Sequence, residues 1–184
     1  MNTIEDCVCT HIETAPTQYL ECRFESVHMN SLILNGYEFE DCEFIGCDLS
    51  LVNLSGSAFR NVTFRECLLQ GVAFNHANPF LLAFHFDHCR LDQSQFIEMD
   101  LRNCSFRNAK VREAIFESCN MQKVAFDRVD LGGTFFDRCN LMNADFRSAE
   151  QLALDPEQNR VKGARFSYQS AIGLLTKYQI KVSH

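Results

Sequence analysis

Apolar residues recur along most of this chain with a period of five. Counting in steps of five from Phe24 gives an unbroken apolar series to Phe84. After a shift of two residues, a second series runs from Phe86 to Phe146. The two series contain 26 positions, here called centres, and 14 of the 17 phenylalanines occupy them. This period matches neither an amphipathic helix nor a long regular strand, whose periods are about 3.6 and 2.

A second apolar position lies two residues before each centre, and we call it the slot. Slots hold small or apolar residues, and eight of the ten cysteines are among them. Although 22% of all residues are charged, no charged residue stands at any of the 51 centre and slot positions. Residues two apart point to the same side of an extended segment, so both positions are predicted to face inward.

The three other positions of each pentad are predicted to bend the chain and face water. Five glycines lie two residues after a centre, where a bend favours a permissive backbone. A chain that bends in this way repeatedly coils into a solenoid whose turns stack on one another. We therefore interpret the slot cysteines as small interior residues, exchangeable with Ala, Val, Ser or Thr.

The repeated pattern resembles that of the pentapeptide repeat proteins. CDLSLVNLSGSAFRN (47–61) and CNLMNADFRSA (139–149) are close to ideal examples, and the resemblance covers roughly residues 22 to 148. It implies an all-β fold, a right-handed quadrilateral β-helix with four pentads per coil. At about 4.8 Å between paired strands, the 26 pentads would form a rod roughly 30 Å long.

The pattern stops near residue 149 and divides the chain into two parts. Residues 1–149 are predicted to form the pentapeptide-repeat β-helix, and residues 150–184 a C-terminal cap. Ser167 can begin a helix, expected at about 168–178, and Ile180 with Val182 predicts a short strand. Four apolar residues at helical spacing are predicted to form a homodimer interface: Tyr168, Ile172, Leu175 and Tyr178.

The segment VKGARFSYQSAIGLLTKYQI (161–180) is similar to the terminal helix of the Qnr and MfpA group and of the microcin-immunity relatives. In that group this helix joins two subunits end to end. Those proteins bind DNA gyrase, and some bind topoisomerase IV, and they protect these enzymes from quinolones or peptide toxins. Their acidic rods are thought to imitate a DNA duplex. The resemblance therefore implies a DNA mimic that binds gyrase and is not an enzyme.

Composition narrows the classes of function further. The net charge of −7 argues against direct binding of nucleic acid through a basic footprint, and it suits a basic protein partner. Ten cysteines and a start without a secretory signal predict reduced thiols and a cytoplasmic location. No apolar run reaches the roughly 18–20 residues that span a bilayer, so no membrane partner is expected.

Acidic residues are concentrated in the first half of the repeats. Residues 21–86 hold eight acids against three arginines. Because residues twenty apart should stack, Glu43 is expected beside Arg23 and Thr63. We predict that an acidic patch binds the partner; it consists of Glu38, Glu40, Asp41, Glu43 and Asp48.

Two other interpretations stay open. The register shift near residues 79–86 offers an alternative contact at Pro79 and Phe80, and the short break at 75–89 contrasts with the longer loops of the Qnr proteins. The sequence therefore leaves open which drug or toxin is opposed. A solenoid that serves as a scaffold for some other protein partner would show the same repeat.

The sequence predicts no metal site and no cofactor. His85, His88 and Cys89 have zinc-ligand chemistry, but the pentad pattern points both histidines outward and the cysteine inward. No nucleophile motif, phosphate loop or spaced carboxylate pair is present. The pattern assigns no role to residues 1–20, which include Cys7 and Cys9.

Overall fold

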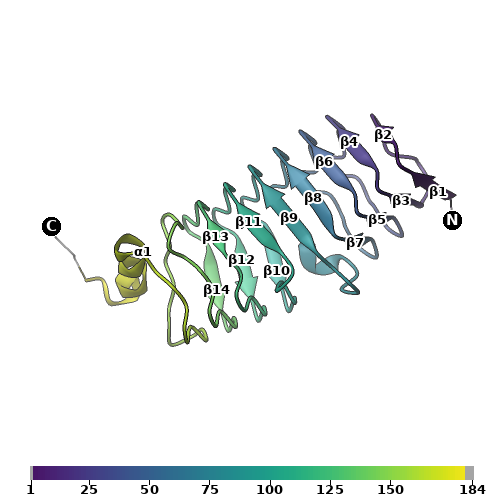
Figure 1. Ribbon diagram of the computed structural model, residues 1–184. Helices are drawn as coiled ribbons and strands as arrows, with labels where there is room; N and C mark the ends of the chain where they lie inside the picture. Colours follow the sequence, from purple (N-terminus) through teal and green to yellow (C-terminus); the bar gives the residue numbers. More distant parts are fainter. Residues whose placement is uncertain (1, 181–184) are drawn as a thin grey trace.

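The computed structural model describes residues 2–180, which form a rod of stacked coils ending in a short helix (Figure 1). The strands are two to four residues long: β1 (Asn2–Glu5), β2 (Val8–Cys9), β3 (Thr17–Leu20), β4 (Arg23–Glu25), β5 (Glu38–Glu40), β6 (Glu43–Ile45), β7 (Ala58–Arg60), β8 (Val62–Arg65), β9 (Phe84–Asp87), β10 (Gln95–Ile97), β11 (Ser105–Arg107), β12 (Ile115–Glu117), β13 (Phe126–Asp127) and β14 (Phe135–Asp137). A 3-10 turn, η1 (Phe74–His76), interrupts them.

Strands of successive coils pair side by side and build the walls of the rod. One sheet has the order β2-β4-β6-β8-β9-β11-β13, a second β1-β3-β5-β7, and a third β10-β12-β14. All pairings between these strands are parallel, and the rungs follow one another from the purple N-terminal end to the green end in Figure 1. The predicted solenoid is therefore confirmed.

The spacing between stacked residues gives the length of each coil. Phe24 pairs with Phe44, and Phe44 pairs with Phe64, so a regular coil contains 20 residues or four pentads. Phe64 pairs with Phe86, 22 residues on, where the sequence pattern shifts by two. At the N-terminal end Cys9 pairs with Phe24, only 15 residues away, so the first coil is one pentad short.

The centres stack into columns of buried side chains along the rod. The rings of Phe24 and Phe44 lie nearly parallel with centroids 4.5 Å apart, and Phe39 of the neighbouring column meets Phe24 edge-on at 5.7 Å. Burying one such ring contributes about 1.5–3 kcal/mol, and an aromatic pair adds roughly 0.5–1.5 kcal/mol. One connected core extends from Tyr19 to Leu154.

The bend after each centre uses a left-handed residue. The five predicted glycines have φ between 60° (Gly46) and 79° (Gly36), and many bends place another residue there, such as Glu66 at 54°. Acidic and amide side chains directly before a centre hold the bend. Asp48 Oδ1, for example, accepts a hydrogen bond of 3.0 Å from the N–H of Ser50, as in an Asx-turn.

Slot side chains connect one coil to the coil before it. Cys47 Sγ donates to the carbonyl of Phe24 at 3.4 Å and to that of Ile45 at 3.5 Å. Ser94 makes the equivalent contact with Oγ, donating to the carbonyl of Leu69 at 3.2 Å. A slot therefore favours a small residue with a weak donor, because it satisfies a buried carbonyl of the neighbouring coil.

The last coil continues past the predicted boundary at residue 149. Phe166 stacks on Phe146 with ring centroids 5.4 Å apart, and Arg165 forms a parallel bridge with Asp145. The cap region thus supplies the final rung of the rod before it turns into the helix.

The terminal helix has two short parts, α1 (Tyr168–Ile172) and the 3-10 helix η2 (Gly173–Tyr178). Ser167 caps it, and its Oγ accepts from the N–H of Ser170 at 3.1 Å. Gly173 lies against the carbonyl of Leu152, where a β-carbon would have no room. Ile180 is in no strand. Val182, the other residue of the predicted short strand, lies outside the described residues.

Candidate partner-binding surfaces

The residues of the predicted acidic patch lie close together on two strands and the bends beside them. Glu38 and Glu40 flank Phe39 on β5, and Glu43 precedes Phe44 on β6, so all three side chains point away from the core. Asp41 lies exposed at the bend between these strands, and Asp48 is half-buried in the next pentad.

Arginines of neighbouring coils neutralise part of this patch. Arg60 reaches Glu38 at 3.0 Å and Glu40 at 3.5 Å. Glu43 lies between two guanidinium groups, with Arg23 at 3.0 Å and Arg65 at 2.6 Å. No other arginine and no lysine lies among residues 21–86, and all three arginines contact the patch. Its field is therefore weaker than the five carboxylates alone would produce.

The stacking of Arg23 on Glu43 follows the predicted twenty-residue spacing. Arg60 and Arg65 were not assigned to the patch from the sequence. Arg60 stacks on Glu40 and also reaches diagonally to Glu38, whereas Arg65 stacks on Ile45 and reaches diagonally to Glu43. The signal that could have found them is their outward position one coil later, within reach of a long side chain.

The register shift forms a projecting loop, residues 79–83. Asn78 still pairs with the preceding coil, donating its N–H to the carbonyl of Ser57 at 2.8 Å. Phe80 and Leu81 then point into solvent, with exposed fractions of 64% and 66%. The chain rejoins the regular pattern when Phe84 pairs with Val62.

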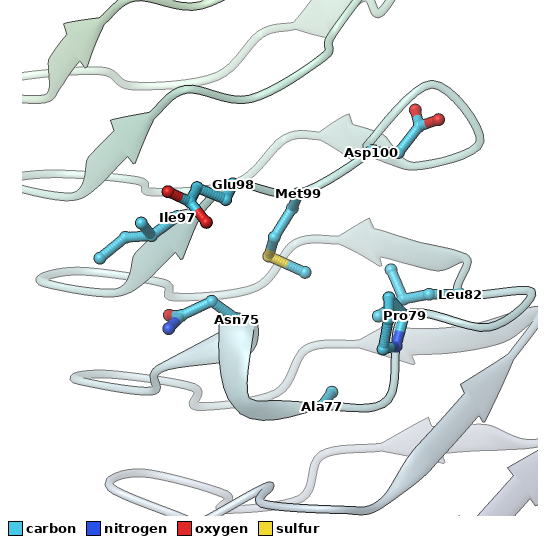
Figure 2. Close-up of a pocket in the computed structure, with 8 residues that line it drawn as sticks. All are labelled: Asn75, Ala77, Pro79, Leu82, Ile97, Glu98, Met99 and Asp100. Carbon is cyan, nitrogen blue, oxygen red and sulfur yellow. The ribbon is translucent and has the colours of Figure 1, made fainter.

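A cavity of about 280 Å³ lies between the coil that carries this loop and the next coil (Figure 2). Pro79 occupies a centre but has no N–H to donate to the next coil. In the next coil, by contrast, Leu101 donates its N–H to the carbonyl of Asn120 at 2.8 Å. Figure 2 shows the Met99 side chain pointing toward the space between the coils, with Asn75 and Pro79 on the coil opposite. Asn75 Oδ1 is buried there without a hydrogen-bond partner among the described residues.

The predicted dimer residues lie on one end of the rod. Tyr168 and Tyr178 are exposed, with fractions of 76% and 53%, and Ile172 and Leu175 are half-buried. Leu174, between them, packs against the core. Leu174 thus packs inward, and of the predicted stripe only Tyr168 and Tyr178 are largely exposed.

A tether holds the helix end to the last coil. Lys177 Nζ contacts Asp155 at 2.7 Å and Glu157 at 2.6 Å. The hydrogen bond from Lys177 lowers the pKa of both carboxyls below their ordinary values, and it raises the pKa of the ammonium group. Tyr178 OH also donates to Glu157 at 2.9 Å.

The histidine and cysteine residues of β9 and the following bend diverge. The His85 ring lies between Asn61 Oδ1 at 3.2 Å and Ser105 Oγ at 3.1 Å, and burial lowers its pKa. Cys89 is buried on the other side of the strand and donates to the carbonyl of Phe64 at 3.3 Å. This arrangement does not bring the ligand atoms to one point.

Three other cysteines do converge, at the N-terminal end of the rod. Cys7 Sγ lies 3.2 Å from Cys9 Sγ and 3.3 Å from Cys22 Sγ. Burial raises the pKa of the Cys9 and Cys22 thiols, and hydrogen bonding to Cys7 raises both further. No other group of three or more metal-ligating side chains comes together within residues 2–180.

Comparison with known families agrees with the architecture. A family model described as a pentapeptide repeat region matches residues 18–84 and 81–155. The chain belongs to the pentapeptide repeat family. No curated protein matches its sequence. No helix in the described part of this pentapeptide repeat protein has the length and apolar character needed to cross a membrane.

Solved structures of other pentapeptide repeat proteins are similar to this one at low sequence identity. A trypsin-treated form of QnrB1, a plasmid-mediated fluoroquinolone resistance protein, is 18% identical with a TM-score of 0.48, over 99% of this chain and 98% of its own. Full-length QnrB1 is 16% identical with a TM-score of 0.39, over 97% and 100%. HetL, involved in heterocyst differentiation regulation in the cyanobacterium Nostoc sp. strain PCC 7120, is 14% identical with a TM-score of 0.48, over 90% and 84%.

Proposed function

We propose that this pentapeptide repeat protein binds DNA gyrase, or its relative topoisomerase IV, as a homodimer. Binding protects the enzyme from a quinolone or a peptide toxin, or modulates its activity. The observation that carries the proposal is the helix after the last coil, which leaves Tyr168 and Tyr178 exposed. Its sequence is the segment similar to the dimer-forming helix of the gyrase-binding group.

The charge distribution suits a local contact better than mimicry of DNA along the whole rod. Three of the five patch carboxylates are paired with arginines, so the acids form no long uninterrupted rows. Asp41 contacts an amide, Asn61 Nδ2, and forms no ion pair with a base within residues 2–180. We therefore place the electrostatic contact at one coil, around β5 and β6, where a basic groove of the topoisomerase would meet it.

A second candidate function is a scaffold for a different protein partner. The projecting loop favours it, because Phe80 and Leu81 are apolar side chains exposed beside a cavity. Exposed large apolar residues at the centre of a contact often carry most of its binding energy. Such a contact would not depend on a basic groove.

A supercoiling assay with purified gyrase distinguishes the gyrase-binding function from the scaffold function. Wild-type protein is titrated into the reaction with and without ciprofloxacin, and binding is measured in parallel by pull-down at several salt concentrations. Protection or inhibition together with binding that weakens as salt rises is the expected result. No binding to gyrase or topoisomerase IV at low salt would rule out the proposal and leave the scaffold.

A further inference from the structure

The first coil of the rod places three cysteines at its open end, and this follows from its length. Cys7 and Cys9 are slot and centre of a pentad in the first coil, and they lie against Cys22 and Phe24, slot and centre of a pentad in the next coil. Fifteen residues are three pentads, so the five-residue register run backward from Phe24 places Cys9 at a centre and Cys7 in a slot.

Cys9 stands where later coils have phenylalanine. Its column continues with Phe24, Phe44 and Phe64, whose rings fill the interior. A cysteine at this position is much shorter, so its sulfur remains near the sulfur of the slot cysteine Cys7 at 3.2 Å. The end of the column therefore holds thiols in place of a ring.

These three cysteines differ from the slot cysteines of the regular coils. Cys47 and Cys67, for example, are fully buried, and each donates to backbone carbonyls of two coils. Cys7 is only half-buried, so the cluster is open to solvent on the side of this residue. All three sulfurs of the cluster lie within 4.8 Å of one another.

We propose that Cys7, Cys9 and Cys22 bind one thiophilic d10 metal ion, Zn²⁺ or Cu⁺, at the N-terminal end of the rod. Thiolates are the preferred ligands of both ions. Sulfurs bound at about 2.3 Å to a tetrahedral Zn²⁺ lie about 3.8 Å apart, so those of Cys7 and its two neighbours would need to separate by about half an ångström. For Zn²⁺ the fourth ligand would be a water or another small donor from solvent.

Binding releases the thiol protons and ties the short first coil to the second. The three thiols become three thiolates, so three protons leave to solvent for each ion bound. Zn²⁺ offsets two of the three negative charges, and Cu⁺ offsets one. Because the ion binds the folded arrangement, it stabilises the end of a solenoid, which otherwise presents an uncovered core.

The test uses the full-length chain, purified under a phosphine reductant and freed of metal. Co²⁺ is titrated as a spectroscopic probe of thiolate coordination, and Zn²⁺ is added to displace it. In a second arm Cu⁺ competes with a chelator of known affinity. We expect one ion per chain, a thiolate-to-cobalt charge-transfer band, and a melting temperature that rises with the ion that binds. The arm with the tighter binding identifies the ion.

Two variants make the result specific to the cluster. Cys9 lies in the short first coil at the end of the rod, so the variant Cys9→Ser should fold. We expect the metal affinity of this variant to be at least about tenfold lower than that of the wild type. Cys47→Ser changes a slot cysteine in a regular coil and should bind as wild type does. Substoichiometric binding of both ions by folded wild type would overturn the proposal. So would equal affinity in Cys9→Ser, or a disulfide within the cluster in protein isolated without oxidant.

Discussion

At the scale of the residue, the slot cysteines act as donors as well as interior filler. Each places a weak S–H group against a carbonyl of the preceding coil, as Cys47 does with Phe24. Alanine, valine and threonine also occupy slots, and Thr134 makes the same contact to Val111 through Oγ1. Burial also raises the pKa of Cys42 to about 12 and of Cys104 to about 12, so these thiols stay neutral and inert at physiological pH.

Substitutions at Cys47 should separate volume from charge. Cys47→Ala removes one weak donor and a small volume, and we expect it to cost about 1 kcal/mol. Cys47→Asp buries a carboxylate without a cation, and we expect at least about 3 kcal/mol and loss of the coil. Thermal unfolding followed by circular dichroism measures both. Equal melting temperatures for the two variants would contradict the buried position of this slot.

At the scale of the element, the loop at 79–83 is an insertion of two residues into one coil. Removing Phe80 and Leu81 leaves Pro79 as a centre and makes Phe84 a slot five residues after Ala77 in the shortened chain. Twenty residues would then separate Phe64 from Phe86. Because the shortened chain satisfies the five-residue pattern without a shift, we expect it to fold.

The same deletion tests the loop as a contact. If Phe80 and Leu81 bind the partner, the deletion should abolish binding in a pull-down while the melting temperature stays within a few degrees of wild type. Phe135→Ala is the matched control, since Phe135 is also exposed, at 58%, but lies on β14. Unchanged binding by the folded deletion variant would remove the loop from the interface.

The tether of η2 should respond to acid. The pKa values of Asp155 and Glu157 are lowered in the folded chain, so the tether contributes in full above their ordinary pKa values and is lost as pH falls through the lowered ones. Below about pH 4, we expect faster amide hydrogen exchange in residues 168–180 after correction for the intrinsic rate. Lys177→Met should show this faster exchange already at pH 7. Exchange in this variant that matches wild type at pH 7 would show that apolar packing alone holds the helix.

At the scale of the whole molecule, the five-residue period was enough to predict the solenoid. The predicted inward positions are buried except at the slot Leu32 and the centre Pro79, which are exposed, so the columns of Phe24 and Phe44 follow from the count. The first coil could not be predicted in this way. Residues 10–16 contain no centres, and two tyrosines hold them instead, with Tyr19 OH accepting from the N–H of Glu13 at 2.9 Å and Tyr37 OH donating to its carbonyl at 2.5 Å.

The neighbours of the acidic patch could also be predicted from the sequence only in part. Stacking by twenty predicted which residues are neighbours along a column, and Arg23 beside Glu43 is one case. Diagonal ion pairs such as Arg60 with Glu38 depend on side-chain rotamers, which a repeat pattern does not encode. The number of acids in a segment therefore overstates the charge that its surface presents.

Assembly is tested at the terminal helix. Leu175→Glu places a charge in the predicted stripe of Tyr168, Ile172, Leu175 and Tyr178, and we expect it to convert a twofold dimer to a monomer in light scattering. Thr176→Glu is a matched control on an exposed residue of the same helix that is outside the stripe. A wild-type chain that is monomeric at micromolar concentration would refute the interface.

The ion pairs of the acidic patch decide which substitutions can test the charge contact with gyrase. Reversing Glu38, Glu40 and Glu43 to lysine would weaken gyrase binding, but it would also set new cations against Arg23 and Arg60 and disturb the coil. Changing the three glutamates to glutamine removes the charge and keeps hydrogen-bonding groups of the same size. We expect this triple variant to bind gyrase about tenfold more weakly, with a shallower dependence on salt.

A second triple variant supplies the control. Glu98, Glu113 and Glu117 lie in the other half of the rod, and changing them to glutamine alters the net charge by the same amount. Because the proposed contact is local to one coil, this variant should bind gyrase as wild type does. Equal weakening in both variants would mean that the overall field of the rod attracts the enzyme, while no weakening in either would move the contact to Phe80 and Leu81.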